Sequence, residues 1–413
     1  MLKRESNLKR KGSEIMNILV INCGSSSIKG QLVKMPEYDV VAKFSIGRVG
    51  KEDAHVSIKA KGKDDFFEVA PVRNHEKGIK SMLHLIFEGD GKLMDIKDVS
   101  AVGHRVVHGG DKMSDSVIAD DNVLEYIESI CDLAPLHNPA HLAGIEACKK
   151  LMPGVPQITV FDNGYHHELP KSVYTYAIPH EYAEKHNIRK FGFHGIAFRS
   201  MLDECKRILG DNLENKKIIL LMLGSGTTAN ASFNGKSLEV STGFTPLEGL
   251  IQSTRSGDTD PAVFTFLMKK EDLSPEDIDE VANKKSGWLG MSGISNDMRE
   301  IYEAAKNGDE RAQNAIDTVC HRIKKYIGAY SAVLGGLDIL AFGGGVGEHA
   351  WYIREKVLEN LEFLGIELNI DVNRNLKGEG LVTSSDSQAK VLVTKVDEEK
   401  VIAEDTFNLI RLN

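Results

Sequence analysis

The sequence lacks the features of a membrane-spanning, secreted or zinc-binding protein. No apolar stretch approaches the roughly 18 residues that a membrane span needs, and residues 1–15 contain basic side chains without the apolar core of a signal peptide. The five cysteines are odd in number and include no C-x-x-C pair, which argues against a disulfide framework or a zinc knuckle. We therefore predict a protein of the reducing cytoplasm.

Charge excludes a further class. The chain of 413 residues has 51 basic and 60 acidic side chains, a net charge of −9, which disfavours a general nucleic-acid binder. Nine of the fourteen histidines lie between positions 104 and 194, yet there is no H-E-x-x-H motif, so we do not expect a histidine-bound metal. Any affinity for anions must come from local groups.

Three glycine-rich segments each follow an apolar strand: 22–29 after 18–21, 224–229 after 218–223, and 343–348 after 339–342. Glycine allows close approach of the backbone, and exposed N–H groups and small hydroxyls suit phosphate oxygens. None matches the Walker loop, and the third fits G-x-G-x-x-G poorly. We interpret them as loops around a polyphosphate. For the first, the alternative is a serine-rich β-hairpin turn.

The order of expected elements repeats. Strands at 16–22, 28–34, 39–47, 55–60 and 65–70 precede a helix near 74–88, and strands at 218–223, 228–233 and 237–241 precede helices near 260–268, 275–284, 294–305 and 308–334. This predicts duplicated α/β domains. We expect a disordered extension at 1–15, or translation starting at Met16; a domain at 16–165 completed by a last helix at 397–413; and a nucleotide-binding domain at 166–396.

Several turn motifs present a cation or a hydrogen-bond donor. They contain Arg105, His137, His194 and Arg255, and two arginines on such turns can clamp a phosphoryl group through fork-shaped donors. Asp162 follows the strand 158–161, where α/β proteins commonly place their chemistry. The alternatives are structural turns with a surface charge and, for Asp162, a helix or turn cap.

Seven motifs, taken in order, closely resemble acetate kinases of the acetokinase family. They are N-x-G-S-S-S-x-K, G-H-R-V-V-H-G-G, L-H-N-P, F-G-F-H-G, G-F-T-P-L-E-G, T-R-S-G-D and D-M-R, and the resemblance extends from Met16 to the C-terminus. It implies the acetate and sugar kinase/Hsp70/actin fold, with two ribonuclease-H-like domains and a cleft between them. It also implies transfer of a phosphoryl group from ATP to acetate with Mg²⁺, or Mn²⁺ as an alternative, and a homodimer.

The resemblance also implies a role for each matching residue. The catalytic residues would be Asp162, His194 and Arg255, and Mg²⁺ would lie near Asn22 and Glu398. Substrate would contact Arg105, Val107, Leu136, His137, Phe193 and Pro246. The nucleotide would contact Lys29, Met222, Leu223, Gly224, Ser225, Gly226, Asp297, Met298, Arg299, Gly345, Val346, Gly347, Glu348 and His349.

Elementary chemistry supports this activity. Acetate is ionised at pH 7, so it needs charge relief rather than a general base, and Asp162 is expected to orient an arginine or the metal ion. The alternatives are a propionate or other short-chain acyl kinase, a relative using another nucleotide or pyrophosphate, and a nucleotide-binding regulator. The altered donor and the regulator are alternatives because the sequence departs from the family pattern at several positions. Met222 and Ser225 stand where the pattern has His and Asn, and residues 163–165 and Phe198 also differ from it.

Overall fold

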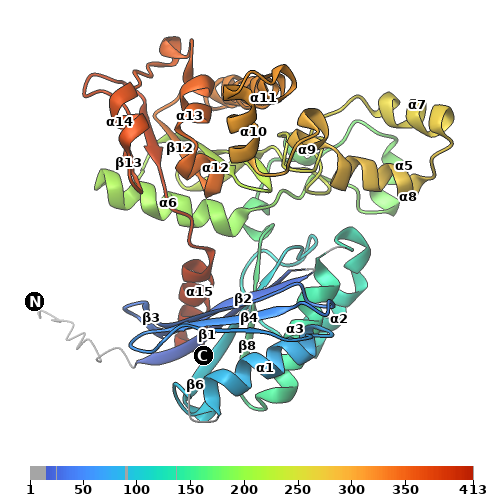
Figure 1. Ribbon diagram of the computed structural model, residues 1–413, viewed down its shortest axis with the longest axis vertical. Helices are drawn as coiled ribbons and strands as arrows, with labels where there is room; N and C mark the ends of the chain where they lie inside the picture. Colours follow the sequence, from blue (N-terminus) through green and yellow to red (C-terminus); the bar gives the residue numbers. More distant parts are fainter. Residues whose placement is uncertain (1–14, 25, 89–91, 136, 413) are drawn as a thin grey trace, which may run out of the picture. The chain divides into compact units, whose positions relative to one another are not determined.

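The computed structural model describes residues 15–24, 26–88, 92–135 and 137–412, which form two compact units (Figure 1). The first unit takes its described residues from 15–107, 115–160 and 399–412, and the second from 108–114 and 161–398. The expectation for the N-terminal extension lies outside the described residues, apart from Ile15. The segment 108–114, expected in the first domain, packs with the second unit: the side chain of Asn163 accepts from Gly109 N at 2.8 Å and donates to Gly110 O at 2.9 Å.

The first unit is built on a mixed sheet of strand order β5-β4-β3-β2-β1-β6-β8-β7. Its strands are β1 (Met16–Gly24), β2 (Ser27–Met35), β3 (Asp39–Gly47), β4 (His55–Ala60), β5 (Phe66–Val69), β6 (Val99–Val106), β7 (Val117–Ile118) and β8 (Gln157–Phe161). Its helices are α1 (His75–Phe87), η1 (Ile96–Asp98), α2 (Asp121–Ser129), η2 (Cys131–Leu133), α3 (Asn138–Leu151) and α15 (Glu398–Leu412). β1 pairs antiparallel with β2 and parallel with β6.

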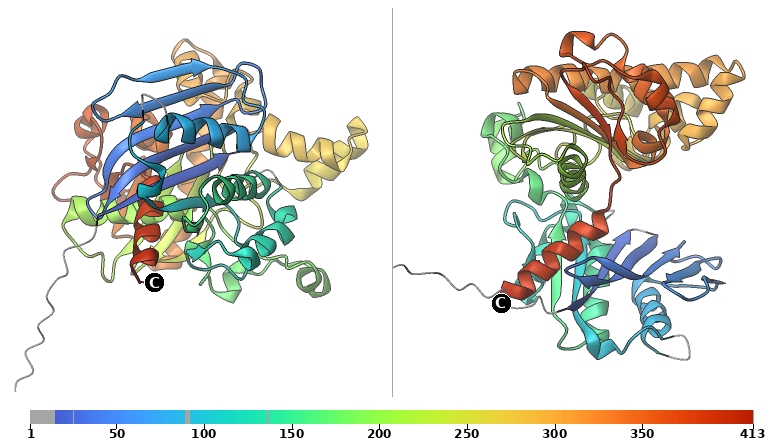
Figure 2. Two further views of the ribbon diagram at one scale, coloured as in Figure 1. Left: turned by 90° about the horizontal axis from the view of Figure 1, so that it is seen from below. Right: turned by 90° about the vertical axis from the view of Figure 1, so that its left-hand side faces the viewer.

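Helices cover both faces of this sheet. Leu19 and Ile21 of β1 share a core with α1 and α3, whereas Gly103 of β6 lies directly against Ile402 and Thr406 of α15. Because side chains alternate along a strand, the apolar run of β1 is buried on both sides, as expected for a sheet covered on both faces. Figure 2 shows α15 and α1 on opposite sides of the strands.

The second unit is built on a sheet of order β11-β10-β9-β12-β14-β13. Its strands are β9 (Lys217–Leu223), β10 (Thr227–Phe233), β11 (Lys236–Val240), β12 (Ile339–Gly343), β13 (Gly380–Leu381) and β14 (Lys390–Val393). Its helices are η3 (Gly164–His166), α4 (Lys171–Tyr174), α5 (His180–Lys185), α6 (Gly195–Leu209), α7 (Pro261–Glu271), α8 (Pro275–Glu280), η4 (Val281–Lys285), α9 (Gly287–Ser292), α10 (Met298–Lys306), α11 (Glu310–Leu334), α12 (Gly344–His349), α13 (Trp351–Leu358), η5 (Glu362–Leu364) and α14 (Ile370–Asn375).

This sheet is also sandwiched between helices. Phe198 and Met201 of α6 pack with Ile218 and Leu220 on one face, whereas α11 and α13 pack over the face formed by alternate residues such as Leu221. Figure 1 shows α6 on one side of the strands and α11 and α13 on the other. Because helices pack on both faces of the sheet, the ends of β9 and β12 are held in place together with the segments that follow them.

The two units share one topology, which confirms the predicted duplication. In each sheet a hairpin pairs antiparallel, and its first strand then pairs parallel with a strand from later in the chain: β1 with β6, and β9 with β12. The first glycine-rich segment connects β1 to β2 and the second connects β9 to β10, so the two segments occupy equivalent places in the two units. The hairpin-turn alternative is thus right as a description of local structure, and it does not conflict with binding of an anion.

Two helix expectations need correction. The expected helix at 294–305 starts four residues later, as α10 at Met298, and the short helix α9 before it, which ends at Gly293 with φ of 70°, was not expected. The expected helix at 275–284 ends as α8 at Glu280 and continues as a π turn. Within the described part of the chain, no helix is both long and apolar enough to span a bilayer.

Candidate active site

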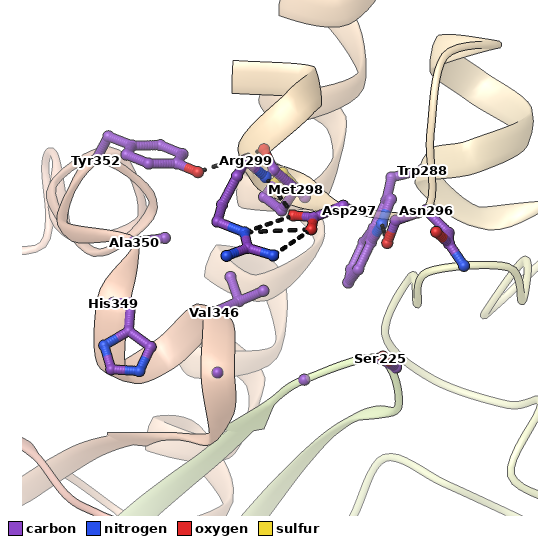
Figure 3. A pocket seen from close by; sticks show the side chains of 12 residues that line it. Ser225, Trp288, Asn296, Asp297, Met298, Arg299, Val346, His349, Ala350 and Tyr352 are labelled. Atoms are coloured by element: carbon purple, nitrogen blue, oxygen red, sulfur yellow. Dashed lines mark hydrogen bonds and ion pairs between the residues drawn. The ribbon is translucent and has the colours of Figure 1, made fainter. Parts of the chain in front are cut away.

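The second unit contains a pocket of about 590 Å³ next to the segments that follow β9 and β12. Segments from the second glycine loop, α9, α10 and α12 surround it (Figure 3). Its lining residues are Gly224, Ser225, Trp288, Asn296, Asp297, Met298, Arg299, Gly345, Val346, His349, Ala350 and Tyr352. Eight of these twelve are among the residues expected to hold a nucleotide: Gly224, Ser225, Asp297, Met298, Arg299, Gly345, Val346 and His349.

Asp297 holds Arg299 at the rim of this pocket. The Asp297 carboxylate caps α10 by accepting from the backbone N–H of Arg299 at 2.9 Å, and it also accepts from the Arg299 guanidinium, with the shortest contact at 2.5 Å. These hydrogen bonds lower the pKa of Asp297. Figure 3 shows the Arg299 guanidinium hydrogen-bonded to the Asp297 carboxylate and lying over the pocket. An exposed flat cation fixed in this way can contact the face of an aromatic ring.

The third glycine-rich segment was expected to be a loop, but Gly344–His349 form the short helix α12, which packs on the second glycine loop. Gly343 pairs with Met222 across β12 and β9, and at Gly344, where φ is 75°, a Cβ would lie only 2.8 Å from the carbonyl oxygen of Leu223. A side chain at position 344 would therefore push the two loops apart. Ser225 lines the pocket, whereas five other residues expected at the nucleotide are not among the lining residues: Met222, Leu223, Gly226, Gly347 and Glu348.

A wholly buried arginine fastens α12 from behind. Arg354 is 1% exposed and donates to the carbonyl oxygens of Gly347 at 2.8 Å and Glu348 at 3.0 Å. It also donates to Asn373 Oδ1 at 2.7 Å and Asn373 O at 3.0 Å. Burial lowers the pKa of Arg354 to about 10. Four neutral oxygens thus replace the water around this cation, and the arginine in turn fixes the end of α12.

His194 lies against the second glycine loop. Its φ of 61° places it in the left-handed region, and the Gly195 N–H donates to Asp162 O at 2.8 Å. The imidazole Nδ1 lies 2.9 Å from Thr228 Oγ1 on β10. A Cβ built on Gly226 would stand 3.1 Å from His194 Nε2, so the Cε1–Nε2 edge of the ring faces this glycine.

Arg255 lies near the same glycine. Its Nη1 donates to Gln252 Oε1 at 3.1 Å, and that oxygen would be 3.6 Å from a Cβ at Gly226. Gln252 Nε2 donates to the carbonyl oxygen of Pro246 at 2.5 Å. Burial lowers the pKa of the Arg255 guanidinium. Within the described residues, no carboxylate lies within ion-pair distance of Arg255, so the second unit contains a partly buried cation whose hydrogen-bond acceptor lies beside the same glycine as the His194 imidazole.

Asp162 is buried at the end of β8, and its backbone joins the turn that carries His194. Phe193 is also buried: its N–H donates to Thr242 Oγ1 at 2.9 Å and its carbonyl oxygen accepts from His166 Nε2 at 3.1 Å. Burial lowers the pKa of His166 to about 3, so this ring stays neutral and orders the turn.

Residues 163–165 and Phe198, where the sequence departs from the family pattern, have structural contacts. Asn163 secures the Gly109–Gly110 turn, Tyr165 is hydrogen-bonded to Ser232, and Phe198 is fully buried in the core of α6. Gly164 lies directly against the carbonyl oxygen of Ser114, where a side chain would not fit. These residues therefore support the segments that carry the site.

The first unit brings together another subset of the expected residues. Arg105 Nη1 donates to Asn22 Oδ1 at 3.3 Å, and Lys29 faces Asn22 across the β1-β2 pair with its side chain exposed. His137 is at the N-cap position of α3. Val107 is buried, and Leu136 lies outside the described residues. Next to Arg105, burial and then the guanidinium charge lower the pKa of His141 well below its usual value.

No group of three or more His, Cys, Asp or Glu side chains suitable for a metal ion occurs in the part of the chain that the structure describes. The two expected ligands are Asn22 on β1 and Glu398 at the start of α15. An amide oxygen and a carboxylate are hard donors of the type that Mg²⁺ prefers, and Mg²⁺ commonly takes few protein ligands with phosphate oxygens and water. The donor set therefore fits Mg²⁺ held chiefly through a nucleotide.

Several residues of this site were not predicted from the sequence. Trp288, Asn296 and Tyr352 line the pocket, Thr228 contacts His194, and Gln252 contacts Arg255. A usable signal existed for Tyr352 alone, since the aromatic pair Trp351-Tyr352 follows the third glycine loop at short range. The others lie in segments without a recognisable motif.

Comparisons with known proteins agree with this architecture. The model of the acetokinase family matches residues 17–404. An acetate kinase of Caldanaerobacter subterraneus subsp. tengcongensis is 46% identical over 398 residues, which are 96% of this chain and 99% of that protein. The crystal structure of Porphyromonas gingivalis acetate kinase matches with a TM-score of 0.91 at 42% identity, covering 96% of this chain and all of the other. A propionate kinase from Francisella tularensis subsp. tularensis matches with a TM-score of 0.88 at 35% identity, covering 95% and 99%.

The fold and these matches define the chain as a kinase, an enzyme that transfers phosphoryl groups. More narrowly, it belongs to the acetokinase family, to which the model assigns nearly the whole chain. The resemblance inferred from the seven motifs is thereby confirmed, and so is the fold class.

Proposed function

We propose that the protein is an acetate kinase that reversibly transfers the γ-phosphoryl group of ATP to acetate. The observation that supports this most is that the His194 imidazole and the Gln252 oxygen bonded by Arg255 both lie beside Gly226, because an imidazole and a guanidinium near one glycine loop suit a phosphoryl group. The near full-length similarity to acetate kinases supports the choice of acetate and ATP.

In the proposed reaction a carboxylate oxygen of acetate attacks the γ-phosphorus. The bond between that phosphorus and the β,γ-bridging oxygen breaks, which gives acetyl phosphate and ADP. Acetate is already ionised at neutral pH, so no proton needs to move. The obstacle is repulsion between two anions, and the charge on the equatorial oxygens must be stabilised during transfer.

Each residue then has a role in relieving this repulsion. Arg255 and the Nε2 side of His194 contact the phosphoryl oxygens, and Arg105 contacts the acetate carboxylate. Asp162 orients these cations and does not transfer a proton. Val107, His137, Phe193 and Pro246 would contact the acyl group; Leu136, the fifth expected contact, lies outside the described residues.

The nucleotide binds the pocket in Figure 3, with Arg299 beside the base and the second and third glycine loops beside the phosphates. Lys29 contacts the phosphates as a point charge. Asn22 and Glu398 would each offer an oxygen to Mg²⁺, and the bound ion would offset the charge of the phosphate oxygens. A homodimer, cytoplasmic localisation and Mn²⁺ as a substitute metal remain predictions.

A second candidate is propionate, because a propionate kinase matches the fold closely and one methylene is worth only about 1–3 kcal/mol of discrimination. Hydroxylamine trapping of acyl phosphate separates these substrates. The purified protein is incubated with acetate, propionate or butyrate, each with ATP, GTP or pyrophosphate. We expect the highest rate with acetate and ATP.

Arg255→Ala tests the chemistry in the same assay. It should lower kcat by more than about 100-fold while changing the KM for acetate much less. An unchanged kcat would contradict the proposed role of Arg255. Failure of the wild-type protein to form acyl phosphate with any pair would favour a nucleotide-binding regulator.

A further inference from the structure

Gln252 is a buried amide that bridges two segments of the candidate site. Its side chain is 1% exposed and lies in the loop between β11 and α7. Its Nε2 donates to Pro246 O at 2.5 Å, and its Oε1 accepts from Arg255 Nη1 at 3.1 Å. It thus links an expected acyl-pocket residue to an expected catalytic residue.

Chemistry determines the orientation of this amide. The carbonyl oxygen of Pro246 can only accept a hydrogen bond, and the guanidinium of Arg255 can only donate one. Among side chains of this length, only glutamine provides a donor for the first and a neutral acceptor for the second. A glutamate would leave a buried carboxylate oxygen facing the Pro246 carbonyl, and a methionine would make neither hydrogen bond.

Arg255 depends on this contact for its direction. In the described part of the chain, Gln252 Oε1 is the sole hydrogen-bond partner of the Arg255 side chain, and no carboxylate pairs with it. The backbone of Gln252 is fixed as well: its N–H donates to Arg255 O at 3.1 Å, and its carbonyl oxygen accepts from the Trp288 N–H at 3.0 Å. The amide is therefore a rigid support for a flexible cation.

The same amide lies beside the second glycine loop. A Cβ at Gly226 would be 3.6 Å from Gln252 Oε1 and 3.1 Å from His194 Nε2. The Gln252 oxygen therefore lies beside the same glycine as the imidazole edge, bonds one nitrogen of Arg255 and leaves the other guanidinium donors available for an anion.

We propose that Gln252 is a positioning residue that aims the Arg255 guanidinium at the transferring phosphoryl group and couples this aim to the Pro246 segment. The inference rests on the proposed function for the identity of the reaction. Because the Gln252 amide is neutral, it does not offset the positive charge of Arg255, which stays available to the substrate.

Kinetics of Gln252→Met and Gln252→Glu test the role. Misplacement of a catalytic group by about 1 Å costs about 100-fold, so Gln252→Met should lower kcat by 10- to 100-fold and change the KM for ATP less than threefold. Gln252→Glu should also lower kcat, because a carboxylate neutralises Arg255. Gln313→Met is the matched control: Gln313 is exposed on α11, where it donates to Asp317, and kcat should be unchanged. Wild-type kcat in both Gln252 variants would overturn the proposal.

A double-mutant cycle separates positioning from general support of the fold. ATP formation from acetyl phosphate and ADP, detected with luciferase, is sensitive enough for weak variants. In the Arg255→Ala background, Gln252→Met should change kcat by less than twofold, because the residue it serves is already missing. Multiplication of the two losses would contradict a role through Arg255.

A crystal structure of Gln252→Met gives an answer that does not need activity. We expect the Arg255 guanidinium to leave its position beside Gly226 while the backbone of 246–255 stays in place. An unmoved guanidinium would overturn the proposal. If the wild-type protein forms no acyl phosphate, the proposed function fails, but this structural result still decides the role of Gln252.

Discussion

Gly226 and the His194 imidazole are in such close contact that a Cβ at position 226 would lie 2.9 Å from Cε1 and 3.1 Å from Nε2 of the ring. The need for glycine here is steric, because its φ lies outside the left-handed region. Any side chain must move the imidazole or the loop. The second glycine loop and His194 therefore form one unit.

Gly226→Ala tests this packing. We expect kcat for acetyl phosphate formation to fall by at least about 10-fold, since the displaced imidazole loses contact with the phosphoryl group. The thermal midpoint should change little. Gly328→Ala in α11 is a control with nothing within 4 Å of the new Cβ; it should keep full activity and gain up to about 1 kcal/mol of stability. Wild-type kcat in Gly226→Ala would show that the ring position is unimportant.

Thr228 selects the state of the same ring. Its buried hydroxyl lies 2.9 Å from His194 Nδ1, and the partner of one imidazole nitrogen determines which nitrogen keeps the proton. Thr228→Val should lower kcat by about 10-fold, close to the ~1.4 kcal/mol of one hydrogen bond, and should alter the pH profile of kcat. Thr228→Ser should restore both. Equal profiles for the valine and serine variants would contradict the assignment.

Arg354 should be important for stability and for nucleotide affinity. Arg354→Met leaves four buried oxygens without their donor, so the free energy of unfolding in urea should fall by at least about 2 kcal/mol. The KM for ATP should rise more than that for acetate, because α12 adjoins the nucleotide pocket. Arg374→Met is the control: this arginine is half-exposed and pairs with Glu355, and its loss should cost less than about 1 kcal/mol.

Buried histidines predict a specific loss of stability in mild acid. Burial lowers the pKa of His104 and His108 to about 4 and that of His166 to about 3. The unfolded chain, with a histidine pKa near 6.5, binds protons that the folded chain excludes. Stability is therefore complete above about pH 6.5 and falls as the pH drops towards 4 and then 3.

Urea unfolding between pH 7.5 and 5 measures this loss. Each such histidine contributes a slope of up to ~1.4 kcal/mol per pH unit. His104→Gln should reduce the slope, since glutamine can still donate to Gln157 without titrating. His180→Gln, on the exposed surface of α5, should leave it unchanged. An equal slope in His104→Gln and the wild-type protein would contradict this explanation.

The strands could be predicted from the sequence because apolar runs bounded by glycine have few alternatives. The expected strands at 39–47 and 55–60 match β3 and β4 in both limits, and 218–223 misses β9 by one residue. The long α11 also followed from its 3.6-residue periodicity. The short helix α9 was missed, because six residues between two glycines are too few to show a helical period.

The supporting residues of the site could not be predicted. Thr228 and His194 are 34 positions apart and meet through the pairing of β10. Arg354 has the sequence context of a surface helix residue, yet it is wholly buried. Gln252 lies in a loop without a periodic pattern, and its role follows from the two atoms that it bonds. Motifs indicate residues that touch a ligand, whereas residues that hold those in place depend on tertiary contacts.

Phosphorus NMR of the purified protein with acetate, ATP and Mg²⁺ tests the central claim most directly. We expect acetyl phosphate and ADP to form in equal amounts at the expense of the γ-phosphate signal of ATP, and Arg255→Ala to slow this conversion by more than about 100-fold. Unchanged ATP, or release of inorganic phosphate without acetyl phosphate, would contradict the proposed phosphoryl transfer to acetate.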